Sequence, residues 1–339
     1  MKTKQKPLYL SIVMISAFLV FLSSCQTGSN PVRGPAEARQ RAMAKEILSV
    51  LINEYQNKDA CRSAVRALRN LGDPAIREIT RALKDDDIME ESKVHMASSI
   101  CGSSPAALDA LPVLYDLIRS DGKIPSYQKT NLRSACIEAV GYIGPAGGEK
   151  SALVLKDVIA SSKDKQLLQK ALFSAAMLRK EARPLIPELV RVATWDSDST
   201  SRSFAVNALG NIGHEAVEAV PVLLSVMRDY RLRNDRMGWN LTINAANAIL
   251  RIDPNEMEPA QYLVDCCFEH KDDALEFGTV YSFILNLGDV MEPELRKRLE
   301  KPFSLDSPDY EVLNKLSKLL ERIDAGKKEK EESGMHAKG

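Results

Sequence analysis

Two stretches of the chain repeat one pattern: Ser63-Ala64-Val65-Arg66-Ala67-Leu68-Arg69-Asn70-Leu71-Gly72 and Ala205-Val206-Asn207-Ala208-Leu209-Gly210-Asn211-Ile212-Gly213. In both, apolar residues stand eight, five, four and one positions before a glycine. This spacing places them on one face of an α-helix, and the glycine can adopt the positive φ that ends a helix. Each stretch therefore predicts a helix with one buried face, followed by a tight turn.

The pattern recurs along the chain, with a reference column at intervals of 30 to 42 residues: Gly72, Gly102, Gly144, Lys180, Gly213, Asp253 and Gly288. Five positions before the column, six of the seven residues are alanine: Ala67, Ala97, Ala139, Ala175, Ala208, Ala248 and Phe283. A small side chain there lets neighbouring helices approach closely. In the fourth unit Arg179 falls in an apolar column and a one-residue shift improves the fit, so that register stays open.

A second helix is expected after each column, because proline is favoured in a first helical turn. The prolines that mark these starts are Pro112, Pro187, Pro221, Pro259 and Pro293. The repeated stretches resemble HEAT repeats, particularly the bacterial HEAT-like class named after phycobilisome lyases, from about residue 59 to 300. The resemblance implies an all-α solenoid of helical hairpins, and it concerns architecture rather than chemistry.

Composition agrees with an all-α fold and excludes some classes of function. The 339 residues include 46 Lys and Arg against 46 Asp and Glu, so the bulk charge expected of a nucleic-acid binder is missing. Hydrophobic residues make up 45% of the chain and aromatic residues only 6%. The core must therefore be built from Ala, Leu, Ile and Val, which suits packed helices.

The N-terminus has the features of an export signal. Lys2, Lys4 and Lys6 precede an apolar run from Pro7 to Leu22 that is short for a membrane span, and Leu22-Ser23-Ser24-Cys25 follows. This ending resembles the lipobox of bacterial lipoproteins. The resemblance implies cleavage before Cys25 and attachment of a lipid to its thiol, with an uncleaved anchor helix as the alternative. Gln26 after the cysteine implies an outer-membrane address facing the periplasm.

The chain is therefore expected to have four parts. They are a signal peptide over 1–24, a lipidated cysteine with a flexible spacer over 25–35, a solenoid over 36–324 and a charged disordered tail over 325–339. Removal of the signal peptide leaves 43 basic and 46 acidic residues.

No catalytic or metal-binding pattern is found, and no cofactor is expected. The histidines are His95, His214, His270 and His336, and no two have the spacing of a helical metal site. The HEAT-like deoxyhypusine hydroxylases bind two irons through several His-Glu dipeptides within first helices. This chain has one such dipeptide, His214-Glu215, placed after Gly213 in the expected turn. Solvated turn residues are the favoured interpretation.

The six cysteines do not predict disulfides, because five remain, an odd number, once Cys25 is lipidated. Cys136 and Cys101 occupy columns that hold Ala, Leu or Ile in other units, so we expect both to be buried. The adjacent pair Cys266-Cys267 lies within an apolar helical segment and lacks the second pair of a zinc site. Packing is therefore favoured over metal binding or redox chemistry.

One segment between two units departs from the repeat and is the candidate contact surface. It contains Tyr230, Arg231, Arg233, Arg236 and Trp239, residue types that dominate binding hot spots. The alternative is a solvated extension in which Trp239 fills the edge of the core. The leading hypothesis is a membrane-tethered, non-enzymatic scaffold for a protein or peptide partner. The other is a catalytic or accessory subunit of a HEAT-like enzyme, either hydroxylase-like or lyase-like.

Overall fold

The computed structural model describes residues 33–102, 104–120, 126–195, 198–231, 236–301 and 306–336, and every regular element in these ranges is a helix. The chain forms two compact units, which meet in the sequence between Leu185 and Ile186. The expected signal peptide, Cys25 and the spacer up to residue 32 lie outside the described residues. The all-α solenoid expected from the sequence is confirmed.

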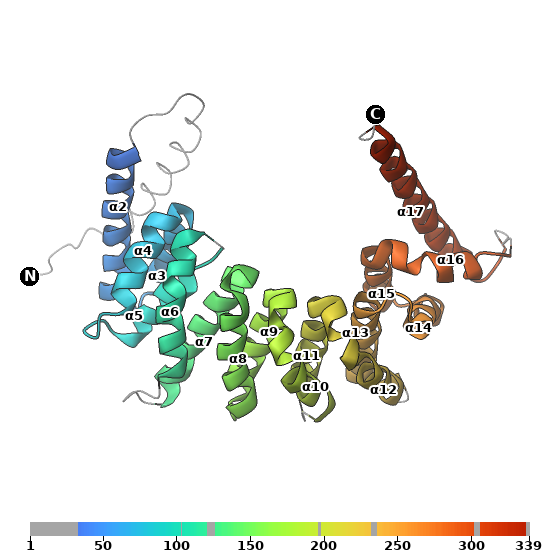
Figure 1. The fold of residues 1–339 in the computed structure, drawn as a ribbon, viewed down its shortest axis with the longest axis horizontal. Helices are drawn as coiled ribbons and strands as arrows, with labels where there is room; N and C mark the ends of the chain where they lie inside the picture. Colours follow the sequence, from blue (N-terminus) through green and yellow to red (C-terminus); the bar gives the residue numbers. More distant parts are fainter. Residues whose placement is uncertain are drawn as a thin grey trace, which may run out of the picture. The chain divides into compact units, whose positions relative to one another are not determined.

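The first unit opens with a helix outside the repeat pattern, α2 (Arg33–Asn53), which packs on both helices of the first hairpin. The hairpins and the elements after them are α3 (Lys58–Leu71), α4 (Asp73–Leu83), α5 (Glu90–Ser99), α6 (Pro105–Arg119), α7 (Ser126–Ile143), η1 (Gly144–Gly147), α8 (Gly148–Ser161), α9 (Lys165–Leu178) and η2 (Arg179–Leu185). First helices α3, α5, α7 and α9 pack in series, as do second helices α4, α6 and α8 (Figure 1).

The second unit continues the alternation of first and second helices. Its elements are α10 (Ile186–Trp195), α11 (Ser199–Ile212), η3 (Gly213–Ala219), α12 (Val220–Arg231), α13 (Arg236–Ile252), α14 (Met257–Glu269), α15 (Ala274–Leu287), η4 (Gly288–Met291), α16 (Glu292–Arg298) and α17 (Tyr310–His336). Within this unit, α11, α13 and α15 pack in series. Helix α12 packs on α13, α14 packs on both α13 and α15, and α16 packs on α14 and α17.

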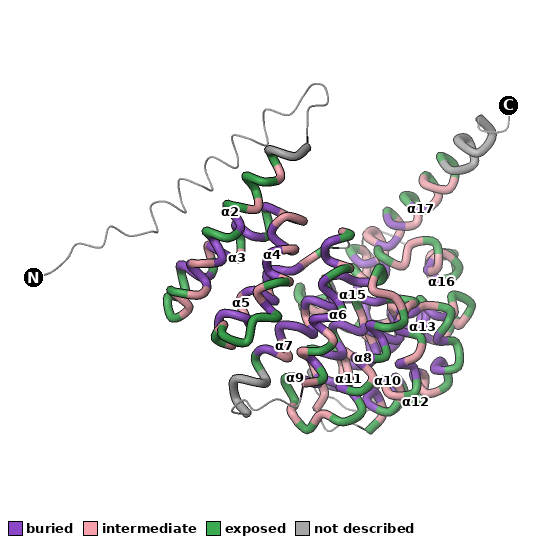
Figure 2. The backbone as a smooth tube through the Cα atoms, turned by 60° about the vertical axis from the view of Figure 1, so that its left-hand side comes forward, coloured by how far each residue is buried: buried purple, intermediate pink, exposed green. Residues whose placement is uncertain are grey.

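The core lies between the packed helices, where the predicted alanines are buried. All six alanines five positions before the column are at most 4% exposed, and Figure 2 shows buried residues on the sides of the helices that face their neighbours. Gly210 shows why these positions are small. A Cβ added to this glycine would lie 2.9 Å from the Cβ of Ala248 on α13. The helices approach closely because both positions are small.

Two of the turns after first helices share one backbone conformation. Gly72 has φ 64° and ψ −136°, and Gly213 has φ 76° and ψ −147°. Arg179 adopts nearly the same angles, φ 54° and ψ −132°, and is the one non-glycine residue with positive φ among the described residues. The column of the fourth unit is therefore Arg179 rather than Lys180, and Leu178, fully buried, takes the preceding apolar position.

In the second repeat, which ends at Gly102, the buried apolar position lies one residue earlier than expected. This corrects the expectation for Cys101. Helix α5 ends at Ser99, and Ile100 is fully buried, whereas Cys101 is partly exposed. Ile100 therefore fills the apolar position that was assigned to Cys101. The branched Ile100 side chain has more apolar surface to bury than a thiol, which accounts for the outcome.

The proline signal was right at four positions and wrong at one. Helices α10, α12, α14 and α16 begin within two residues of Pro187, Pro221, Pro259 and Pro293, respectively. Pro112, by contrast, lies inside α6, which begins at Pro105. The Oγ of Ser104 accepts a hydrogen bond from the backbone N–H of Ala107 at 3.2 Å, so the stronger start signal lies seven residues earlier.

The C-terminal segment differs from the expected disordered tail. Helix α17 continues to His336, and its apolar residues Val312, Leu316, Leu319 and Ile323 are buried on one face. Beyond them, Lys327 pairs with Glu292 of α16. The segment after Ala325 is rich in Lys and Glu, which are good helix formers and can pair along a helix, so the helix extends past its last buried residue.

Candidate functional site

The predicted contact segment runs from the end of α12 to the first turn of α13. Tyr230 and Arg231 are the last residues of α12, and Arg236 is the first residue of α13. Arg233 lies outside the described residues, as do the side chains of the other three. The backbone thus brings these residues to one end of a helix pair, and the prediction that they form a contact surface stays a prediction.

Trp239 lies in the first turn of α13 and is half-buried. Its ring contacts the ring of His270 at the end of α14, with centroids 5.1 Å apart and planes at 62°. The Nε1 of Trp239 is buried and has no hydrogen-bond partner among the described residues. In turn, the Nδ1 of His270 lies 2.7 Å from a carboxylate oxygen of Glu276 on α15. Trp239 therefore packs against the end of α14, the second helix of its own hairpin, while part of it stays accessible.

The His214-Glu215 dipeptide lies in η3, directly after the turn glycine, and both residues are exposed. Nowhere in the described part of the chain do three or more His, Cys, Asp or Glu side chains converge in a way that could hold a metal ion. The sequence placed the His214-Glu215 dipeptide in the turn after Gly213, and the structure confirms this position.

Four of the five described cysteines are buried: Cys61, Cys136, Cys266 and Cys267. Burial raises the pKa of the Cys136 thiol, and the nearby Glu90 carboxylate raises it further. Burial likewise raises the pKa of Cys267 to about 12, with a smaller contribution from Cys266. Because the thiolate is the reactive form, these cysteines act as small apolar core residues at neutral pH.

An apolar patch that the repeat pattern did not predict lies on first helices α7 and α9. Tyr142 is 43% exposed, and Phe173 and Met177 are each 37% exposed. Phe173 and Met177 are four residues apart on α9, so they share a face of that helix. Large apolar side chains that stay accessible at helical spacing are typical of contact surfaces.

The close approach of α7 and α9 holds this patch together. A Cβ built on Gly141 would lie 2.6 Å from the Oγ of Ser174, so the two helices nearly touch beside Tyr142 and Phe173. The Ser174 hydroxyl also donates a 2.9 Å hydrogen bond to the carbonyl oxygen of Ile137. Near the patch, Lys170 of α9 pairs with Glu138 of α7. The patch therefore lies on two closely packed helices, with a charged pair of residues next to it.

A signal for this patch does exist in the sequence. Tyr142 and Met177 stand two positions before their columns, and Phe173 stands six before, all outside the buried stripe. In the units that end at Gly72 and Gly213, the same positions hold Arg66, Asn70, Asn207 and Asn211. Apolar residues at positions that are polar in other units would have marked this surface, once the register of the fourth unit was corrected.

None of the described helices is sufficiently long and apolar to span a bilayer.

Comparison with known proteins agrees with the repeat architecture. A model of the PBS lyase HEAT-like repeat matches residues 60–85 and 201–229. An engineered protein of known structure is 19% identical, with 93% of this chain and 90% of that chain covered and a TM-score of 0.44. Human deoxyhypusine hydroxylase in complex with glycerol is 15% identical, with 86% and 99% covered and a TM-score of 0.33. No curated protein matches the chain. The chain therefore contains PBS lyase HEAT-like repeats at α3–α4 and α11–α12.

Proposed function

We propose that this protein is a membrane-tethered, non-enzymatic scaffold that binds a protein or peptide partner at the bacterial cell envelope. The observation that carries the proposal is the patch of Tyr142, Phe173 and Met177 on α7 and α9. Stacked helical hairpins offer long, shallow surfaces that suit extended partners better than small substrates.

The chemistry of the patch favours a protein or peptide as the ligand. Tyrosine and phenylalanine bury a large area with few rotatable bonds, and methionine adapts to irregular partners. The Glu138–Lys170 ion pair beside them supplies the polar rim that surrounds an apolar centre in many interfaces.

Partner capture tests this proposal. Crosslinking in cells, followed by pull-down through a C-terminal tag, should recover a partner with the native chain and lose most of it with Tyr142→Ala/Met177→Ala. Loss of two central contacts typically costs more than 1 kcal/mol each, a reduction in affinity of about tenfold or more. Leu153→Ala on α8, where Leu153 is 44% exposed, is the matched control and should capture normally. Equal capture by all three chains would contradict the assignment of this surface.

The segment around Trp239 is a second contact surface to test in the same assay. If it binds the partner, Arg231→Ala/Arg233→Ala/Trp239→Ala should lower capture at a temperature at which the variant remains folded. Binding through the arginines should also weaken as salt rises, because exposed charges are screened over about 8 Å at physiological ionic strength. A loss of stability without a specific loss of capture would instead assign Trp239 to packing alone.

The tether rests on the leader sequence and on Cys25. Metabolic labelling with a fatty acid should mark the native chain, and Cys25→Ala should abolish the label and block maturation. Label that persists in Cys25→Ala would refute lipidation at this residue. Membrane fractionation then tests the outer-membrane address. Stoichiometric iron or zinc on the purified chain would support the enzymatic alternative.

A further inference from the structure

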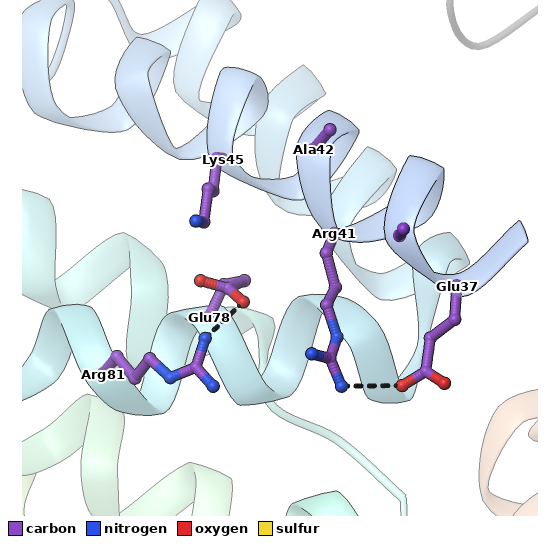
Figure 3. A pocket seen from close by; sticks show the side chains of 7 residues that line it. Glu37, Arg41, Ala42, Lys45, Glu78 and Arg81 are labelled. Carbon is purple, nitrogen blue, oxygen red and sulfur yellow. Dashed lines mark hydrogen bonds and ion pairs between the residues drawn. The ribbon is translucent and has the colours of Figure 1, made fainter. Parts of the chain in front are cut away.

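A charged pocket lies between α2 and α4 in the first unit and has a volume of about 400 Å³. Helix α2 contributes Glu37, Arg41 and Lys45, which stand four residues apart and therefore share one face. Helix α4 contributes Glu78 and Arg81. Figure 3 shows the side chains of the two helices directed toward the space between them.

The two carboxylates of the pocket are already neutralised by arginines. Glu37 pairs with Arg41 at 2.8 Å and with Arg77 at 2.6 Å, and the hydrogen bond and charge of Arg41 hold the pKa of Glu37 below its usual value. Glu78, only 6% exposed, pairs with Arg81 at 2.6 Å. Glu37 therefore stays ionised at neutral pH, and both carboxylates already have arginine partners.

Positive charge remains after this pairing. The lining holds three cations against two carboxylates, and the pairs described above leave Lys45 over. Lys45 makes no hydrogen bond or ion pair with any residue that the structure describes. The Nε of Arg41 is likewise buried and without a hydrogen-bond partner in the described part of the chain. The pocket thus has an unmet capacity for a group that accepts several hydrogen bonds and carries negative charge, as a phosphate does.

We propose that this pocket binds the phosphate group of an anionic phospholipid headgroup and gives the protein a second point of attachment to the membrane. The proposal rests on the tether proposed above, because only seven residues separate Cys25 from Arg33. Fully extended, that stretch spans about 28 Å at most, so the start of α2 stays close to the bilayer.

The distribution of charge along the chain supports a membrane surface as the source of the phosphate. Residues 33–84 hold 11 basic and 6 acidic side chains, whereas residues 85–339 hold 32 basic and 40 acidic. The positive part is the one next to the lipid. Residues 1–32 contain no Asp or Glu, so the segment before α2 has no carboxylate side chain to fill the pocket. One lipid anchor with a nearby cationic site binds membranes more firmly than the anchor alone.

Lysine footprinting on the native lipidated chain tests the site. The protein is reconstituted into vesicles of phosphatidylcholine, with or without phosphatidylglycerol, and treated with an amine-acylating reagent before mass spectrometry. We expect Lys45 to react about fivefold more slowly in the phosphatidylglycerol vesicles, the change that one cation bound at an anionic surface provides. Exposed Lys150 on α8, in the same unit, is the internal control and should react equally in both.

A variant tests whether the protection of Lys45 depends on the pocket. Arg81→Gln retains a hydrogen-bond donor for Glu78 but removes one cation, and it should lose most of the protection of Lys45. Lys84, at the end of α4 and outside the pocket, reports on the general surface field. Equal protection of Lys45 and Lys84, or no effect of phosphatidylglycerol on Lys45, would overturn the proposal.

Two further additions identify the source of the anion. In phosphatidylcholine vesicles, inorganic phosphate or an oligoglutamate peptide should leave the reactivity of Lys45 nearly unchanged. Strong protection by either would overturn the assignment to a lipid headgroup, in favour of a free phosphate or an acidic peptide. Failure of the tether is distinguished separately, because a chain without a lipid on Cys25 would not sediment with phosphatidylcholine vesicles at all.

Discussion

Two glycines in the second compact unit, which begins at Ile186, provide a matched test of the close helix packing. Gly210 lies inside α11, where a built Cβ would meet the Cα and the Cβ of Ala248, each at 2.9 Å. Gly278 lies inside α15, where a built Cβ would meet nothing within 4 Å. Replacing each with alanine adds the same methyl group to the same kind of backbone, in one environment that is filled and in one that is open.

The expected magnitudes follow from two opposing effects. Alanine is favoured over glycine within a helix by about 1 kcal/mol, so Gly278→Ala should stabilise the protein by about 0.5–1 kcal/mol. Gly210→Ala has the same gain, but contacts at 2.9 Å are far inside the usual 3.5–4.0 Å, and such overpacking costs about 1–3 kcal/mol. The two variants should therefore differ by about 1–3 kcal/mol, with Gly210→Ala the less stable.

Thermal unfolding followed by circular dichroism measures this difference. For a unit of this size, each kcal/mol corresponds to about 2–4 °C in melting temperature. Because both substitutions fall in the same unit, they report on the same unfolding transition. Equal melting temperatures for the two variants would show that α11 and α13 do not approach as closely as described, and the reasoning about the alanine column would fail with it.

Three more substitutions test individual positions. Arg179→Gly should raise stability by about 1 kcal/mol, because glycine adopts the backbone angles of this turn without the strain of a side chain; a lower melting temperature would contradict this. Ala208→Leu should cost about 1–3 kcal/mol in the free energy of unfolding, since Ala208 is fully buried, and an unchanged melting temperature would show the column misplaced. Trp239→Ala should cost about 1–3 kcal/mol through the lost contact with His270, and a urea titration with no shift in midpoint would argue against that packing.

The fold was predictable because its signals are local and repeated. Apolar residues at helical spacing and small residues at one column appear in most units, so errors in single units do not alter the fold class. The register of the fourth repeat was harder, since its turn lacks a glycine, and in the second repeat α5 ends at Ser99, three residues before Gly102. Ile100 and Arg179 show that burial and backbone angles, rather than residue type alone, decide which residue occupies the column.

The candidate sites were less predictable, because they depend on neighbours that are distant in the sequence. Tyr142 and Phe173 stand on two helices that approach closely only because residue 141 is a glycine. Likewise, the pocket joins Lys45 to Arg81 through the packing of α2 on α4, and α2 is outside the repeat pattern. Sequence spacing predicts the face of one helix, and it does not identify the helix that will stand opposite.

The polar links between first helices have a consequence for how the chain folds. Arg69 donates to the carbonyl oxygen of Ser98, Lys170 pairs with Glu138, and Arg251 donates to Asn211, over separations of 29, 32 and 40 residues, respectively. Each link therefore spans about one repeat. A chain that emerges N-terminus first can add each hairpin to the one already formed, without waiting for a distant segment. At any moment only about 40 residues need to await their partners, which limits the apolar surface open to aggregation during folding.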